Sequence, residues 1–151
     1  RQVIGEAYRH KVLFVISQSD KVEPTSSNSQ LSTAQKLNIS RKICLLHELF
    51  QPVHPVCAVS VRARWGLRIM AERMIRCLPR EASSPVVAQL QSPFRTATVQ
   101  EKARNDFGET VGATLDAVSA LPLIPAPVRA VIRAVRDTVV SVARSVWNFF
   151  F

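Results

Sequence analysis

The sequence predicts an α/β fold: two parallel strands alternate with two helices (strand–helix–strand–helix), and a C-terminal helical extension follows. Two short runs rich in β-branched residues, 11–17 and 56–61, are typical of strands buried on both faces of a parallel sheet. Apolar residues recur at helical spacing between these runs and again after the second one. Helical patterning then dominates residues 98–151, with no internal repeat.

The first predicted strand runs from Lys11 to Ser17 and is apolar through its middle. It ends in the polar sequence Ser-Gln-Ser-Asp at 17–20. A stretch rich in Ser, with Pro24 and Asn28, then covers 23–29, and such a composition is typical of a surface loop.

The two helices of the α/β part have clear boundaries in the sequence. Ser32 and Gln35 have the spacing of a capping box, which predicts a helix over 33–50. Pro52 and Pro55 follow the end of this helix. A second helix is predicted over 64–78, with one apolar face, and it is stopped by a proline. The residues of that face are Leu67, Met70, Ala71, Met74 and Leu78.

The composition changes after Arg80, where short Ser-Pro sequences recur. The motifs at 83–85 and 92–93 are typical of joints, so we expect a linker over 81–97. This divides the chain into an α/β domain at 1–80 and a helical extension at 98–151.

The extension is predicted to hold two helices. The first covers about 98–121, with Gly108 and Gly112 weakening it. Prolines at 122, 125 and 127 separate it from a final helix, for which Pro127 is a favourable first residue.

The final helix has an apolar seam with alternating steps of four and three residues, typical of helix pairing. Its members are Val128, Ile132, Val135, Val139, Val142, Val146 and Phe149. Five charges between 129 and 144 argue against a membrane-spanning helix. Two arrangements remain open for residues 127–151. The helix could lie in a membrane interface as a basic amphipathic helix, or it could dock on the preceding helix as a hairpin, which the intervening prolines favour.

Lysine and arginine outnumber aspartate and glutamate by 20 to 11, which gives a formal net charge of +9. This balance favours anionic partners, namely nucleotides, RNA or an acidic membrane face, and the alternative is a solvated basic surface without such a partner. Arginines are dense around the second helix, where they indicate either a ribosome or RNA contact or a solvated helix face. They are Arg62, Arg64, Arg68, Arg73, Arg76 and Arg80.

The three cysteines form no Cys-x-x-Cys motif, which predicts reduced thiols and a cytoplasmic protein, with peripheral membrane attachment as a further option. His47 and His54 have no clustered Cys or carboxylate residues near them in sequence, so no zinc site is predicted. The chain begins with Arg1, which suggests a fragment or a truncated reading frame.

Two segments resemble the base-binding motifs of Era-, TrmE- and septin-like GTP-binding proteins, which belong to the P-loop, TRAFAC class. In that family a buried strand ends in Asn/Thr-Lys/Gln-x-Asp, and here the strand at 12–16 is followed by Ser17-Gln18-Ser19-Asp20. A Ser-Ala-Lys/Arg motif ends the next strand in the family, and here Ser60-Val61-Arg62 follows about forty residues later.

The resemblance implies a role for each motif residue. Asp20 would accept hydrogen bonds from guanine N1–H and the exocyclic amine, while the Val61 backbone N–H would meet guanine O6. The Gln18 and Arg62 stems would cover the two faces of the base. Ser17 stands where the family has Asn or Thr.

Two further departures from the family concern Val61 and the phosphate site. Val61 stands where Ala is usual, which predicts a more crowded base edge. The sequence has no Gly-x-x-x-x-Gly-Lys-Ser/Thr loop and no Asp-x-x-Gly switch. The resemblance therefore implies residues 1–80 to be the C-terminal part of a GTPase domain. GTP or GDP would be held by its guanine only. The residues that hold Mg²⁺ in the family are absent from this sequence, so we expect no GTP hydrolysis by this chain alone.

The terminal sequence from Arg136 to Phe151 is similar to the basic, Val/Arg-rich helix and aromatic tail of prophage-borne GTP-binding proteins of the YeeP/YfjP type. An alternative function is a non-catalytic helical module that binds a membrane or a protein partner through 127–151. A two-stranded sheet leaves open edges, so we expect the isolated chain to be marginally stable, to self-associate, or to cover these edges with its own C-terminal helices.

Overall fold

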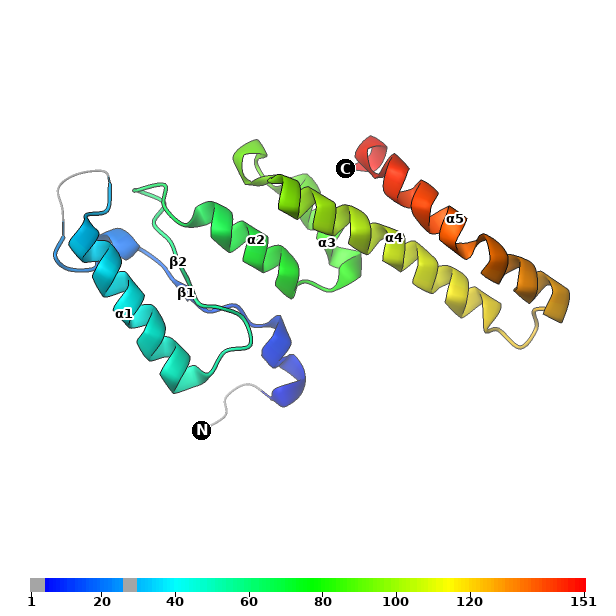
Figure 1. The fold of residues 1–151 in the computed structure, drawn as a ribbon, viewed down its shortest axis with the longest axis horizontal. Helices are drawn as coiled ribbons and strands as arrows, with labels where there is room; N and C mark the ends of the chain where they lie inside the picture. Colours follow the sequence, from blue (N-terminus) through cyan, green and yellow to red (C-terminus); the bar gives the residue numbers. More distant parts are fainter. Residues whose placement is uncertain (1–4, 26–29) are drawn as a thin grey trace. The chain divides into compact units, whose positions relative to one another are not determined.

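A computed structural model describes residues 5–25 and 30–151, so part of the predicted loop, 26–29, lies outside the described residues (Figure 1). The chain divides into two units, Arg1–Cys77 and Leu78–Phe151. The boundary lies close to residue 80, where the sequence predicts the end of the α/β domain.

The first unit contains two parallel strands with helices, as predicted. Its elements in chain order are η1 (Glu6–Lys11), β1 (Val15–Ile16), η2 (Ser19–Lys21), α1 (Thr33–Phe50), β2 (Cys57–Ala58) and α2 (Leu67–Cys77). Strands β1 and β2 pair in parallel with Val15 opposite Cys57 and Ile16 opposite Ala58. Helix α1 forms the crossover between them (Figure 1).

Both strands are shorter than the sequence predicts. Residues 6–11 form the 3₁₀ helix η1, and the ladder is regular only over two residues of each strand. Val15 remains 40% exposed, although the apolar run predicts a fully buried strand. Within the described residues each strand pairs with one other strand, so neither has the hydrogen-bonded partners on both sides that a central strand has.

The predicted helix at 33–50 is confirmed, and so is its cap. The Ser32 side chain accepts from the Gln35 backbone N–H, and the Gln35 side chain accepts from the Ser32 N–H. The second helix begins at Leu67, three residues later than predicted, because residues 60–65 close a tight turn.

A small apolar core lies between the sheet and α1. Its buried members are Val22, Leu31, Ile39 and Ala58, and Ile16, Ile43, Ala63 and Trp65 pack against them. The loop after β1 supplies part of this core through Val22, which fixes that loop against α1.

The second unit consists of three helices and a short 3₁₀ turn. Its elements are α3 (Arg80–Gln89), η3 (Ser92–Phe94), α4 (Ala97–Ser119) and α5 (Ala126–Phe150). Helix α4 packs against both α3 and α5. The segment 81–97, which the sequence predicts to be a linker, thus differs from that expectation, since it contains a packed helix.

Buried hydroxyls explain why the Ser-Ser-Pro motif lies in a helix. The Ser83 hydroxyl donates to the Asp106 carboxylate at 2.5 Å, and the Ser84 hydroxyl donates to the Ala103 carbonyl at 3.1 Å. The Trp147 indole N–H from α5 donates to Ser84 Oγ at 2.8 Å. These partners lie 19 to 63 residues away in the sequence. The composition of the segment itself does not reveal them, and for this reason it predicted a joint.

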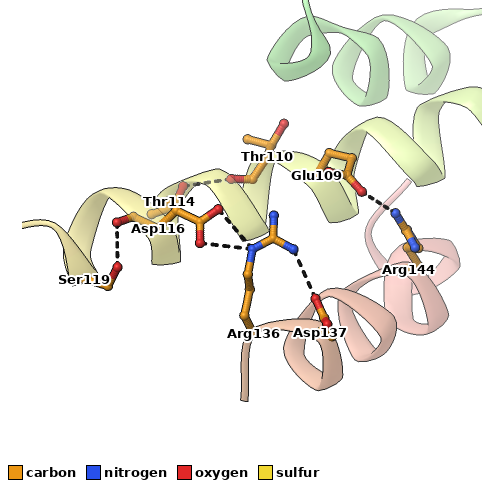
Figure 2. A network of polar contacts seen from close by, with 8 residues as sticks. All are labelled: Glu109, Thr110, Thr114, Asp116, Ser119, Arg136, Asp137 and Arg144. Atoms are coloured by element: carbon orange, nitrogen blue, oxygen red, sulfur yellow. Dashed lines mark hydrogen bonds and ion pairs between the residues drawn. The ribbon is translucent and has the colours of Figure 1, made fainter. Parts of the chain in front are cut away.

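Helices α4 and α5 form a hairpin, the arrangement that the prolines favour (Figure 1). Figure 2 shows two arginines of α5 reaching carboxylates of α4. Arg136 Nε lies 2.9 Å from Asp116 Oδ2, and an Arg144 terminal nitrogen lies 2.6 Å from Glu109 Oε1. Arg136 also contacts Asp137 on its own helix.

The two glycines of α4 face these arginines. A Cβ at Gly108 would lie 2.7 Å from Arg144 Cγ, and one at Gly112 would lie 3.0 Å from both Arg136 and Val140 side-chain atoms. The glycines therefore let α5 approach closely, and this packing offsets their weak helix propensity.

Candidate functional site

The candidate site is formed where the two parallel strands end. The Val59 N–H donates to the Ile16 carbonyl at 2.8 Å, and the Ser19 N–H donates to the Val59 carbonyl at 3.0 Å. The residues that follow β1 are thereby held beside those that follow β2. In open α/β sheets ligands bind outside the carboxyl ends of the strands.

Asp20 and Ser60, forty residues apart, meet at this edge. The Ser60 hydroxyl donates to Asp20 Oδ1 at 2.6 Å. The same hydroxyl oxygen accepts the Ala63 backbone N–H at 3.0 Å, which fixes the direction of its proton. A carboxylate has about four lone-pair positions. Ser60 uses one of them, so Asp20 keeps acceptor capacity on both oxygens.

The pKa of Asp20 is lowered from its ordinary value. The Ser60 hydrogen bond is the largest cause, and a hydrogen bond from the Asp20 backbone and the positive charges of Arg62 and Lys21 add to it, while desolvation opposes the shift. Asp20 is therefore an ionised carboxylate at neutral pH, able to accept two hydrogen bonds from one ligand.

A second residue, Gln35, holds the loop that carries Asp20. Gln35 is 1% exposed, and its Nε2 donates to the carbonyls of Asp20 at 3.0 Å and Val22 at 3.2 Å. The sequence indicates Gln35 only as a capping residue, because its contact with the loop spans 13 to 15 positions.

In the described part of the chain no hydrogen bond or ion pair joins the remaining predicted site residues to the Asp20 side chain, although the charge of Arg62 acts on it. Ser17, Gln18 and Arg62 are exposed, and Val61 is 77% exposed. The Val61 N–H makes no hydrogen bond to the described residues, which leaves it free as a donor. Gln18 has a left-handed backbone with φ of 52°, uncommon for a residue with a side chain.

A tight turn after Ser60 places Val61 and Arg62 at the surface. Ser60 and Trp65 exchange two backbone hydrogen bonds of 3.0 Å each, and the chain leaves the turn through Gly66 with φ of 74°. This turn replaces the first residues of the predicted helix at 64–78.

The basic helix α2 directs one arginine inward. Arg73 Nη1 donates to the carbonyls of Pro55 at 3.1 Å and Val56 at 2.9 Å, which lie just before β2. Arg73 therefore has a structural role, while Arg62, Arg64, Arg68 and Arg76 are exposed.

The described residues contain no group of three or more His, Cys, Asp or Glu side chains that could hold a metal ion. His47 Nε2 accepts the Val56 backbone N–H at 3.3 Å, and His54 Nε2 donates to the His10 carbonyl at 2.6 Å. Within the same described ranges, no helix has both the length and the apolar character needed to cross a membrane.

Three proteins of Escherichia coli strain K12 are similar to this chain. YkfA is 81% identical over 99% of the chain and 52% of its own length. YfjP is 80% identical over 100% of the chain and 53% of its own length. YeeP is 43% identical over 93% of the chain and 61% of its own length. The chain thus spans about half the length of YkfA and YfjP.

The descriptions of these three relatives call them uncharacterized and state no activity. No family model matches the chain. No solved structure matches it either. The likeness to GTP-binding proteins therefore stays a prediction from the two motifs.

Proposed function

We propose that residues 5–77 form the guanine-recognition part of a P-loop GTP-binding domain, with Asp20 as the residue that selects the base. The hydrogen bond from Ser60 to Asp20 carries this proposal, since it joins the two motifs at the carboxyl ends of parallel strands.

The chemistry of guanine fits an ionised carboxylate. Guanine carries two adjacent donors, N1–H and the exocyclic amine, and the free lone pairs of Asp20 can accept both. Adenine presents an acceptor at N1, which would face the carboxylate without a proton. An unmatched polar pair of this kind is costly, so the contact discriminates between the two bases.

The exposed residues beside Asp20 complete the proposed base pocket. The Val61 N–H is free to donate to guanine O6, and the side chains of Gln18 and Arg62 supply stems for the two faces of the base. Arg62 also contributes positive charge beside the Asp20 carboxylate.

Hydrolysis of GTP is a separate matter, because phosphoryl transfer depends on phosphate positioning and Mg²⁺. The sequence has no phosphate loop, on which both the positioning of the phosphates and the binding of Mg²⁺ depend in this class of protein. We propose no catalytic step for this chain, and purified chain should release no phosphate from GTP above a buffer control.

A titration with fluorescent guanine and adenine nucleoside diphosphates tests the base pocket. Asp20→Asn should weaken the guanine nucleotide by about tenfold or more, since a charge-assisted contact is lost. It should leave any adenine binding unchanged. Asp137→Asn is the matched control, because its side chain is 93% exposed on α5 and the charge change is the same. Equal affinities of native chain and Asp20→Asn for the guanine nucleotide would refute the proposal.

The second candidate function is a helical module that binds a partner through residues 127–151. The observation that favours it is an exposed row of apolar side chains on α5.

A further inference from the structure

Helix α5 carries a row of exposed side chains on the side that does not contact α4. The row, called the α5 seam, consists of Val128, Val131, Val135, Thr138, Val142, Ser145 and Phe149. Their positions alternate three and four residues apart over three heptads, which is the spacing of a helix-pairing face. Val131 is 61% exposed, Val142 is 55% exposed and Phe149 is 85% exposed.

The contacts with α4 use a different face of α5. The buried residues of α5 are Val140, Ala143 and Trp147. None of them belongs to the apolar seam that the sequence predicted for this helix, and that predicted seam is only partly buried. Ile132, Val139 and Val146 of that predicted seam are half-buried. At roughly 100° per residue, the buried face and the α5 seam lie on nearly opposite sides of the helix.

The arginines that make α5 basic lie away from the α5 seam, and three of them are engaged. Arg129 donates to the carbonyls of Leu121 and Ile124, while Arg136 and Arg144 pair with carboxylates of α4 (Figure 2). The same helical geometry places Arg133 on the far side from the α5 seam and Asp137 about 130° from its centre.

The residues that flank the α5 seam are uncharged. On one side they are Ala134, Ser141 and Asn148, and on the other they are Ile132, Val139 and Val146. An anionic membrane or a nucleic acid attracts surfaces through exposed cations, which this face lacks. The matching occupant is a neutral apolar helix face, and a second copy of α5 supplies one without bringing like charges together.

We propose that the α5 seam pairs with the α5 seam of a second copy of this chain. Valine occupies the first position of three successive heptads, at 128, 135 and 142, so a pair of these faces brings uncharged, β-branched side chains together along its length. The small residues Thr138 and Ser145 at the alternate positions allow the two helices to approach closely.

The size of the α5 seam sets the strength of this dimer. The 22 residues from Val128 to Phe149 span roughly 32 Å of helix, and a helix face is about 10 Å wide. Such a strip falls below the roughly 1,200 Å² of total buried area in standard interfaces. The dimer is therefore weak and depends on protein concentration.

Sedimentation of the 151-residue chain over a range of concentrations tests the proposal. Val135→Glu should raise the dimer dissociation constant by at least about tenfold, because it places two like charges in the pair. Ala130→Glu, an exposed substitution on α5 outside the α5 seam, is the matched control and should change the constant by less than about twofold. Circular dichroism of each variant verifies that the helices are intact.

A cross-linking measurement tests the proposal independently, in case Val135→Glu fails to fold. In a Cys44→Ser background, Thr138→Cys at the centre of the α5 seam should form an intermolecular disulfide on mild oxidation, and Asp137→Cys should form much less. A monomer at all concentrations, or association that Val135→Glu and Ala130→Glu leave equally strong, would overturn the proposal. So would a monomeric chain that binds vesicles of phosphatidylcholine and phosphatidylserine through Val135.

Discussion

Gly66 sets the direction in which the chain leaves the candidate site. Its φ is 74°, and a Cβ at this position would lie 2.1 Å from the Ala58 carbonyl oxygen of β2. The turn at 60–65 that presents Val61 and Arg62 therefore depends on a residue without a side chain.

Gly66→Ala should lower the free energy of unfolding of the first unit by at least about 1–3 kcal/mol, because it adds a left-handed backbone cost to a steric clash. Urea denaturation followed by the fluorescence of Trp65 measures the change. Gly5→Ala is the control, since the nearest atom to its added Cβ would be 4.0 Å away. Equal midpoints for the two variants would show that the turn is not as tight as described.

Ser60 controls the ionisation of Asp20. Because its hydrogen bond is the largest cause of the lowered Asp20 pKa, Ser60→Ala should raise that pKa toward the ordinary value of an aspartate. A carboxyl group with a lowered folded pKa contributes stability above its unfolded pKa, and this contribution is lost as pH falls through the folded pKa. The contribution of Asp20 should therefore be smaller in Ser60→Ala.

A carbon-13 NMR titration of the Asp20 carboxyl group measures this pKa directly. Ser40→Ala is the control, since the Ser40 hydroxyl donates to the Lys36 carbonyl on the exposed side of α1. An Asp20 pKa that is unchanged in Ser60→Ala would contradict the assigned cause.

At the scale of elements, local signals predicted boundaries and long-range contacts decided the rest. The capping box at Ser32 lies within four residues, so it could be read from the sequence and fixes the start of α1. Ser84 could not be read in this way, because its partners Ala103 and Trp147 lie in other helices. The shortness of the strands could not be predicted either, because the apolar run 11–17 does not indicate how many other strands pair with it.

Trp147 joins α5 to α3 and is 3% exposed. Trp147→Phe should lower the free energy of unfolding of the second unit by about 1–3 kcal/mol, through lost packing and the lost hydrogen bond to Ser84. Thermal unfolding followed by circular dichroism measures the loss. Phe149→Leu, at a position 85% exposed on the same helix, should remain within about 0.5 kcal/mol of the native chain. Equal losses for the two variants would argue against the docking of α5 described above.

At the scale of the whole molecule, the second unit has its own buried network. The contacts of α3, α4 and α5 with one another include the Ser83–Asp106 hydrogen bond at 2.5 Å and the Ser84–Trp147 hydrogen bond at 2.8 Å. A fragment of residues 78–151 should therefore be helical and unfold cooperatively, with Trp147 fluorescence and circular dichroism giving the same midpoint. A fragment without a cooperative transition would show that this unit needs more of the chain.

The two motifs were predicted from the sequence because each follows an apolar strand. Their meeting through Ser60 and Asp20 depends on parallel pairing, which the crossover helix α1 implies. The support from Gln35 was not predicted, because a capping residue gives no sign of contacts outside its own helix.

The central claim is that Asp20 and its neighbours recognise guanine itself. Guanosine and adenosine test it most directly, because neither carries phosphates that would bind a basic protein non-specifically. In backbone amide NMR spectra of the native chain, guanosine should shift the resonances of residues 17–20 and 60–62, and adenosine should not. Shifts of equal size with both nucleosides, or shifts confined to other residues, would contradict the claim.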